Sequence, residues 1–160
     1  MNSKTHSEIM RPVYNMPAHL VRRLQQVTQA IFEAEAGSFG ITSAQFAILQ
    51  TVSLLPGLEQ REVAAAAGYD SVTTSQIIRK LEVLGLLRRN KGSRSRRGQS
   101  VHLTEEGVQA LTEIRPAIDR IQARLIERLP EEKRTAFLQL LSEITDVDNS
   151  HRAGTSRSYK

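Results

Sequence analysis

The chain has 160 residues, a formal net charge of +5 and an apolar share of 39%, which is enough for one domain with a hydrophobic core. Its excess of lysine and arginine favours an anionic partner, either nucleic acid or an anionic membrane surface. The absence of cysteine excludes thiol redox sensing, cysteine-ligated zinc and disulfide bonds. No apolar run reaches the roughly 18 residues of a membrane span, and the N-terminus lacks a signal-peptide pattern, so we expect a cytoplasmic protein.

The N-terminal part predicts a flexible polar arm over residues 1–14, followed by a long helix over residues 15–36. Arg23 lies on the apolar face of that helix, with His19 one turn earlier. An arginine in such a stripe usually lays its stem on apolar surface or pairs with an acid on another helix. The alternative is a guanidinium that binds a carboxylate ligand in a mostly apolar pocket. The residues alone leave both interpretations open.

The next segment contains three short helices separated by clear stop signals. A capping box opens a helix over residues 42–54, and a second, alanine-rich helix is expected over residues 59–67. Asp70 is a suitable N-cap for the third helix, and Gly85 supplies the left-handed residue that commonly follows a last turn. Because a tight turn separates the last two helices, the pattern predicts a helix-turn-helix motif.

The helix over residues 70–85 has one apolar face and one polar face. Short hydroxyls and an amide near its N-terminus, followed by two cations, suit a helix that enters a groove of DNA. The alternative is an ordinary amphipathic surface helix. On the DNA-binding interpretation the hydroxyl and amide side chains lie at base edges and the cations at phosphates: Ser71, Thr73, Thr74, Gln76, Arg79 and Lys80.

Residues 86–89 and 100–103 can form two strands of a hairpin. The segment between them contains no acid and is rich in cations, which a solvated loop would also show. At the tip of a hairpin that directly follows a recognition helix, however, these cations predict a wing that contacts phosphates or a minor groove. Residues 42–103 would then form a winged helix-turn-helix domain, with these wing residues as DNA contacts: Lys91, Arg94, Arg96 and Arg97.

Residues 104–145 predict two further helices, the first capped by Thr104 and expected to bend at Pro116. The tail over residues 146–160 lacks an apolar pattern and is expected to be disordered. The helices over residues 15–36 and 104–145 carry more apolar surface than one small domain needs, which predicts a homodimer. The expected fold class is mainly α (α+β), a winged helix-turn-helix with N- and C-terminal dimerisation helices.

Taken in order, these pieces resemble the MarR family of bacterial transcription regulators. The segments ITSAQFAILQTV, PGLEQREVAAAAGYDSVTTSQIIRKLEVLGLLRR and VHLTEEG are similar to that family's second helix, helix-turn-helix and post-wing helix. Two positions depart from the family pattern. Ser95-Arg96-Arg97 stands where the wing usually carries Asp-x-Arg, which puts in doubt how rigidly the wing is held, and Glu59 replaces the usual hydroxyl cap.

The resemblance implies a homodimer with interlocked terminal helices and a small-molecule pocket between these helices and the DNA-binding lobe. Ligands in the family are often aromatic carboxylates or phenols. The segment YNMPAHLVRRLQQ is also similar to the first helix of the branch that represses nicotinate catabolism, whose ligand is a hydroxylated pyridine carboxylate. On this basis the candidate ligand-binding residues are Tyr14, His19, Arg23 and Phe46.

We therefore expect a repressor that binds an inverted-repeat operator as a dimer and is released by a small aromatic or pyridine carboxylate. The alternative is a constitutive DNA-binding protein without an effector, in an architectural or activator role. The four histidines are scattered without metal-ligand spacing, and neither a nucleophile motif nor a phosphate-binding loop is present, so we expect no enzyme, metal or cofactor. The basic loop has no apolar residue to insert into a membrane, which disfavours a membrane partner.

Overall fold

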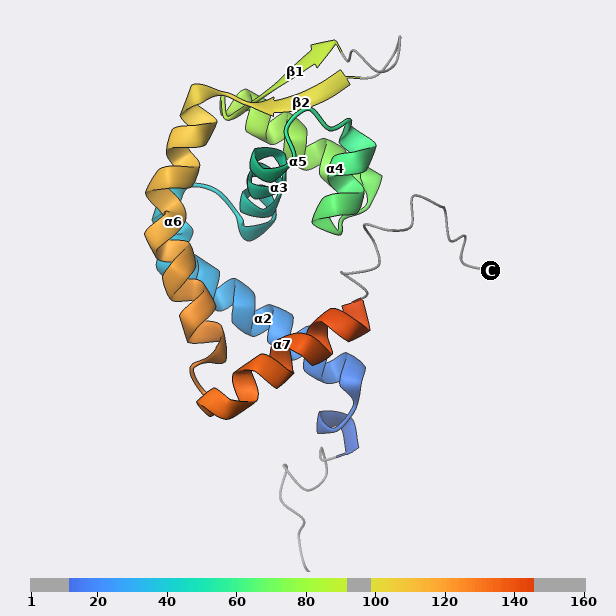
Figure 1. Cartoon of the computed structure of the whole chain (residues 1–160), viewed down its shortest axis with the longest axis vertical. Coiled ribbons are helices and arrows are strands. Elements are labelled where there is room, and N and C mark those ends of the chain that lie inside the picture. Colours follow the sequence, from blue (N-terminus) through green and yellow to red (C-terminus); the bar gives the residue numbers. More distant parts are fainter. Residues whose placement is uncertain (1–11, 92–98, 146–160) are drawn as a thin grey trace, which may run out of the picture.

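The computed structural model describes residues 12–91 and 99–145 (Figure 1). Its elements are α2 (Pro17–Ala36), η1 (Gly37–Phe39), α3 (Ser43–Leu54), α4 (Gln60–Ala67), α5 (Ser71–Val83), β1 (Leu87–Lys91), β2 (Gln99–Leu103), α6 (Glu105–Ile126) and α7 (Glu131–Thr145). The expected fold class is confirmed, because a mainly helical chain carries one two-stranded sheet in the described residues. Of the predicted flexible arm only residues 12–14 are described, and they are helical. The predicted tail, residues 146–160, lies outside the described residues.

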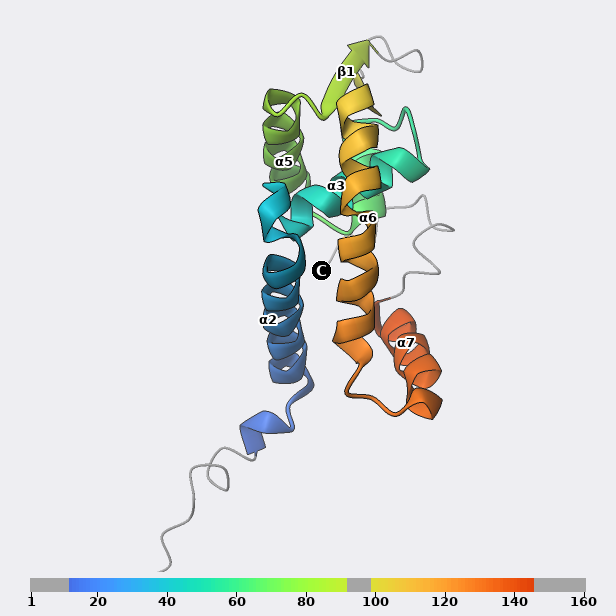
Figure 2. The same cartoon turned by 90° about the vertical axis from the view of Figure 1, so that its left-hand side faces the viewer.

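Two lobes lie at the two ends of α6. One lobe contains α3, α4, α5 and the hairpin, and the other contains α2, the C-terminal half of α6 and α7 (Figure 1). Seen from the side, α2 and α6 run next to each other, and the first lobe continues beyond the end of α2 (Figure 2). Helix α6 therefore connects the hairpin end of the molecule to the end that α7 covers.

Helix boundaries agree with local capping chemistry. Thr42 and Gln45 form a reciprocal capping box at the start of α3, with hydrogen bonds of 2.7 and 3.2 Å. The backbone N–H of Glu59 donates to the Glu62 carboxylate at 2.8 Å, so α4 begins at the expected place without a hydroxyl cap. Helix α6 continues through Pro116 as one element.

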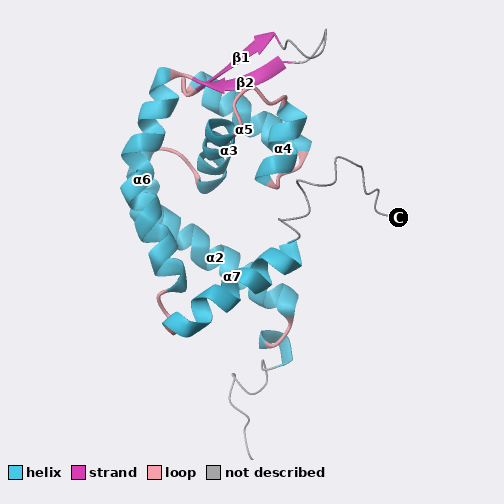
Figure 3. Ribbon diagram, viewed as in Figure 1, coloured by secondary structure: helices cyan, strands magenta, loops and turns pink. Residues whose placement is uncertain are grey.

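The hairpin lies directly over the helix-turn-helix (Figure 3). Strands β1 and β2 pair antiparallel, with Leu87 opposite Leu103 and Arg89 opposite Val101. The Val101 N–H donates to the Leu58 carbonyl at 2.9 Å, and Glu59 forms an isolated bridge with Ser100. These backbone contacts attach the hairpin to the start of α4, so the wing has a defined position relative to the helices below it.

The core of the DNA-binding lobe is apolar and closely packed around α5. The side chains at its centre are fully buried, and they come from α3, α5, β2 and α6: Ile48, Leu49, Ile78, Leu81, Val101 and Ile114. Burial of side chains of this size stabilises a fold by about 1.5–3 kcal/mol each before entropy is subtracted. One face of α5 is thereby held in the core, and its other face is left for solvent.

The other lobe leaves apolar surface uncovered. Helix α7 has no buried residue, and α2 has only two near its C-terminal end. Large apolar side chains are exposed on or beside these two helices: Met16, Leu20, Val21, Val27, Leu138, Leu140 and Ile144. Exposed apolar side chains in this number are typical of a protein–protein interface.

Candidate nucleic-acid interface and effector site

The N-terminus of α5 is organised by Asp70. Its carboxylate accepts hydrogen bonds from the N–H groups of Val72 and Thr73 at 2.9 and 2.8 Å, and from the Thr73 hydroxyl at 2.6 Å. The Thr73 hydroxyl, more than any other group, lowers the pKa of Asp70 below its ordinary value. Thr73 was predicted to contact bases, and in the free protein its hydroxyl proton is committed to this cap.

The lowered pKa of Asp70 makes the cap sensitive to acid. Because the folded-state pKa lies below the unfolded value, the carboxylate stabilises the fold above the unfolded pKa, and this contribution is lost as pH falls through the folded pKa. We expect Asp70→Ala to be less stable than wild type near pH 7, and this difference in stability to be smaller near about pH 2.5. Urea denaturation at both pH values measures this difference. An equal difference in stability at both pH values would contradict the role of the ionised Asp70 carboxylate as the cap of α5.

The outer face of α5 carries four of the six DNA contacts that were predicted on this helix. Ser71, Gln76, Arg79 and Lys80 are exposed, as DNA contacts must be. Val72, which the prediction left out, is also 69% exposed on this helix. These side chains leave α5 free to enter a groove while its inner face stays in the core.

Thr74 was predicted to lie at a base edge, and the structure contradicts this. Its side chain is fully buried, and its Oγ1 has no hydrogen-bond partner among the described residues. The reason is helical geometry, because Thr74 lies one turn before Ile77 and Ile78 and so shares their face. In the sequence Thr74 lies among other hydroxyl residues of the first turn, so its residue type alone did not indicate that it is buried.

Thr74→Val tests this correction. The substitution keeps the shape of the side chain and removes a buried hydroxyl that lacks a partner, so we expect unfolding free energy to rise by about 1 kcal/mol. Operator affinity should stay within about twofold of wild type, which is a change of less than about 0.5 kcal/mol. Thr74→Ser, which keeps the hydroxyl and removes a methyl group, is the control and should be destabilised. A large loss of DNA affinity in a stable Thr74→Val protein would return Thr74 to the interface.

Arg89 holds the base of the wing against the helices. Its Nη2 donates to Gln60 Oε1 at 3.4 Å, and its Nε lies 3.5 Å from Glu82 Oε1 as an ion pair. One side chain thus joins β1 to α4 and α5. This contact was not predicted from the sequence, in which Arg89 follows Glu82 by seven residues.

The wing residues of the prediction are mostly not placed. Lys91 is the last residue of β1, whereas Arg94, Arg96 and Arg97 lie outside the described residues. Strand β1 also carries Arg88, which was not predicted as a DNA contact. Its side chain is exposed and donates to the Asn90 side chain at 3.0 Å. The role of the three tip arginines as DNA contacts stays a prediction.

Helix α6 is attached to the turn that ends α5. The Thr104 hydroxyl donates to the Gly85 carbonyl at 2.6 Å and accepts the Gly107 N–H at 3.0 Å, and the Thr104 N–H donates to the Leu86 carbonyl at 3.2 Å. Gly107 is buried so closely against Leu86 that a Cβ there would lie 2.2 Å from the Leu86 carbonyl oxygen. We call these residues, Gly85, Leu86, Thr104 and Gly107, the α5–α6 joint.

The four candidate ligand residues do not form one site within a protomer. The rings of Tyr14 and His19 lie 5.7 Å apart, and His19 Nε2 is buried without a hydrogen-bond partner among the described residues. Phe46 instead packs on Phe32, with ring centroids 6.4 Å apart. Arg23 is exposed, and its nine-residue separation from Phe32 corresponds to about 14 Å along α2. Bringing Phe46 and Arg23 to one ligand therefore requires more than the contacts of a single chain.

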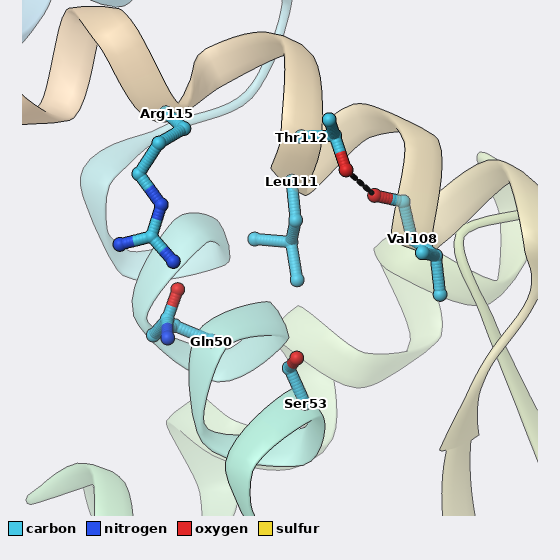
Figure 4. A pocket seen from close by; sticks show the side chains of 6 residues that line it. All are labelled: Gln50, Ser53, Val108, Leu111, Thr112 and Arg115. Atoms are coloured by element: carbon cyan, nitrogen blue, oxygen red, sulfur yellow. Dashed lines mark hydrogen bonds between the residues drawn. The ribbon is translucent and has the colours of Figure 1, made fainter.

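Two clefts lie elsewhere on the DNA-binding lobe. The first, with a volume of about 260 Å³, lies between α3 and α6 and is lined by Gln50, Ser53, Val108, Leu111, Thr112 and Arg115 (Figure 4). The second, a shallow depression of about 380 Å³, lies beside the C-terminal part of α5 and is lined by Gln45, Arg79, Lys80, Val83 and Leu84. Neither cleft contains a predicted ligand residue, so sequence reasoning missed both.

Two other kinds of functional feature are absent from the described residues. No cluster of histidine and carboxylate side chains there could hold a metal ion. Within the same ranges, no helix is both long and apolar enough to cross a membrane.

An exposed recognition helix beside a hairpin wing defines a DNA-binding protein of the winged helix-turn-helix class. A model of the MarR family matches residues 39–98. The chain belongs to the MarR family of transcription regulators.

Relatives cover nearly the whole chain. It is 28% identical to the transcriptional regulator HosA of Escherichia coli over 133 residues, which span 83% of this chain and 97% of HosA. It is also 28% identical to the HTH-type transcriptional repressor NicR of Pseudomonas putida over 155 residues, 92% of this chain and 98% of NicR. These relatives are transcriptional regulators and not enzymes.

Two solved structures extend the comparison to DNA and to a ligand. The repressor CouR, solved on a 23-mer DNA duplex, has a TM-score of 0.79 and 26% identity, covering 89% of this chain and 99% of CouR. BpsR of Bordetella bronchiseptica, whose DNA binding is regulated by 6-hydroxynicotinic acid, has a TM-score of 0.77 and 26% identity, covering 91% of this chain and 99% of BpsR.

Proposed function

We propose that this protein is a homodimeric repressor that binds an inverted-repeat operator and is released by a small aromatic or pyridine carboxylate. The DNA-binding part of this proposal rests on the placement of α5. Its apolar face lies in the core, while Ser71, Gln76 and Arg79 are exposed on the other side of the helix. Side chains of these types hydrogen-bond base edges and phosphates in a major groove.

The uncovered apolar surfaces of α2 and α7 support the homodimer. A two-fold dimer carries two copies of α5, so the operator should contain two inverted half-sites about 34 Å apart, one turn of DNA. Effector binding would favour a dimer in which the two copies no longer match that spacing. This is a population shift, and it requires the effector to bind the two states with different affinities.

The chemistry of the effector is supported by the relatives. BpsR responds to 6-hydroxynicotinic acid, and NicR also aligns over nearly the whole chain. A small planar carboxylate is therefore the first class of effector to test, with a hydroxylated pyridine carboxylate at the head of the panel.

Fluorescence anisotropy on the DNA flanking the protein's own gene tests the proposal. At fixed salt, we expect tight binding that 6-hydroxynicotinate or a related aromatic acid reverses. Tight binding that no acid changes would favour a constitutive DNA-binding protein. Equal affinity for the flanking DNA and for random DNA would overturn the regulator assignment.

Gln76→Ala separates base readout from phosphate binding. A glutamine that reads adenine contributes about 1–3 kcal/mol of discrimination, so we expect Gln76→Ala to lower operator affinity while leaving random-DNA affinity nearly unchanged. Arg79→Ala, on the same exposed face, is the comparison and should weaken binding to both DNAs and reduce the salt dependence. Equal losses on both DNAs for Gln76→Ala would remove it from the base-reading set.

A further inference from the structure

The cleft between α3 and α6 contains an arginine that has no partner among the described residues. Figure 4 shows the Arg115 side chain extending toward Gln50, with Leu111 beside them. Arg115 makes no hydrogen bond or ion pair with any described residue, although Asp119 lies one helical turn further along α6. This guanidinium therefore keeps its donors available to a molecule from outside the chain.

The other arginines of α6 show that this availability is particular to Arg115. Arg120 and Arg124 both bind Glu35 of α2, at 2.7 and 2.5 Å, and the hydrogen bond from Arg120 is the main cause of the lowered pKa of Glu35. These two arginines fasten α6 to α2. Arg115 lies beyond that contact, next to α3, where its lining neighbours offer no carboxylate.

The remaining walls of the cleft suit one ring with a polar substituent. Leu111 and Val108 supply apolar surface, and Gln50 and Ser53 supply an amide and a hydroxyl on the facing helix (Figure 4). The Thr112 hydroxyl already donates to the Val108 carbonyl at 2.9 Å. A volume of about 260 Å³ lies just below the roughly 300 Å³ at which pockets for drug-sized ligands begin, and so favours a ligand of one ring.

We propose that this cleft binds a one-ring aromatic or pyridine carboxylate, with the carboxylate on Arg115 and a ring hydroxyl or oxo group on Gln50. A guanidinium binds a carboxylate through two parallel hydrogen bonds, and Leu111 packs against the ring. The inference rests on the proposed function, since it gives the effector a binding site. It assigns the anion contact to Arg115, in place of Arg23.

The position of the cleft also provides a route from ligand to DNA. Val108 in its lining directly follows Gly107 of the α5–α6 joint, and Gln50 and Ser53 lie on α3, which packs on α5. A ring between α3 and α6 would push the first turns of α6 away from α3. Because Thr104 and Gly107 attach these turns to the end of α5, the movement would change the position of the recognition helix.

Titration calorimetry on the 160-residue chain tests the site without DNA. The probes are 6-hydroxynicotinate and 4-hydroxybenzoate, with benzamide as a ring that carries no negative charge. We expect both acids to bind wild type and benzamide to bind far more weakly. Arg115→Gln should weaken the acids roughly tenfold to a hundredfold, as loss of charge-assisted hydrogen bonds does.

Matched variants make the result specific. Arg128→Gln removes an exposed arginine outside the cleft and should bind the acids as wild type does. Gln50→Leu should weaken 6-hydroxynicotinate more than unsubstituted nicotinate, because only the former offers a ring substituent to the amide. Thermal melting of each variant shows that the fold is retained.

The outcomes separate this site from the proposed function. Undiminished acid binding by Arg115→Gln, or no binding of either acid to wild type up to about 10 mM, would overturn the site. Acid-induced release of operator DNA that persists in Arg115→Gln and disappears in Arg23→Gln would also overturn it, while leaving the proposed function intact. Acid binding that depends on Arg115 but does not alter DNA affinity would support the cleft and overturn the effector role.

Discussion

Replacing Gly107 with alanine should lower the unfolding free energy by about 1–3 kcal/mol, the usual cost of overpacking, and weaken operator binding at least tenfold. A Cβ at this position would lie 2.2 Å from the Leu86 carbonyl oxygen and 3.1 Å from its carbon, so backbone must move. The movement opens the α5–α6 joint, where Thr104 bonds to Gly85 and Leu86. Urea denaturation and anisotropy on operator DNA measure the two effects.

Gly37→Ala is the matched control for this substitution. A Cβ there would approach only the end of the Glu33 side chain, at 2.7 Å, and an exposed carboxylate can rotate away. Gly37 also has φ −57°, which alanine adopts freely. If both variants lost operator affinity equally, or if Gly107→Ala bound like wild type, the joint would not position the recognition helix.

Ile78→Ala should have a large effect on stability. Ile78 is fully buried among side chains of the core, and truncation of such a residue costs about 2–5 kcal/mol. That is a large fraction of the roughly 5–15 kcal/mol that stabilises a typical domain. Since the same side chain anchors the inner face of the recognition helix, we expect DNA affinity to fall as well, measured on protein that is still folded.

Val83→Ala on the same helix is the control for the loss of apolar side chain. Val83 is 89% exposed, so its truncation should change the unfolding free energy by no more than about 0.5 kcal/mol. Comparable destabilisation by the two substitutions would mean that α5 is not held by the core face that contains Ile78.

The contacts of Arg89 are relevant to the position at which this wing differs from the family pattern. The wing of this chain has Ser95 where its family usually has an aspartate, and this raised doubt about wing rigidity. The structure places Arg89 between Gln60 and Glu82 at the base of β1, which ties the wing to both helices of the helix-turn-helix. The base of the wing therefore has a contact that does not depend on the missing carboxylate.

The sequence by itself determined the order and limits of the elements. Capping boxes, N-caps and left-handed glycines act within a few residues, so Thr42, Asp70 and Gly85 mark helix ends in the sequence as they do in the structure. The apolar period likewise predicted that Ile78 and Leu81 face the core. The winged helix fold follows from signals of this short range.

Only the tertiary structure decided which polar side chains face outward and which of them contact another element. Thr74 could not be separated from its neighbours by residue type, because a hydroxyl is compatible with a groove and with a core. The contacts of Arg89 and Gly107, and the cleft that Arg115 lines, bring together residues that are far apart in the chain. Periodicity describes one helix at a time, whereas a brace, a joint or a cleft depends on how two helices pack against each other.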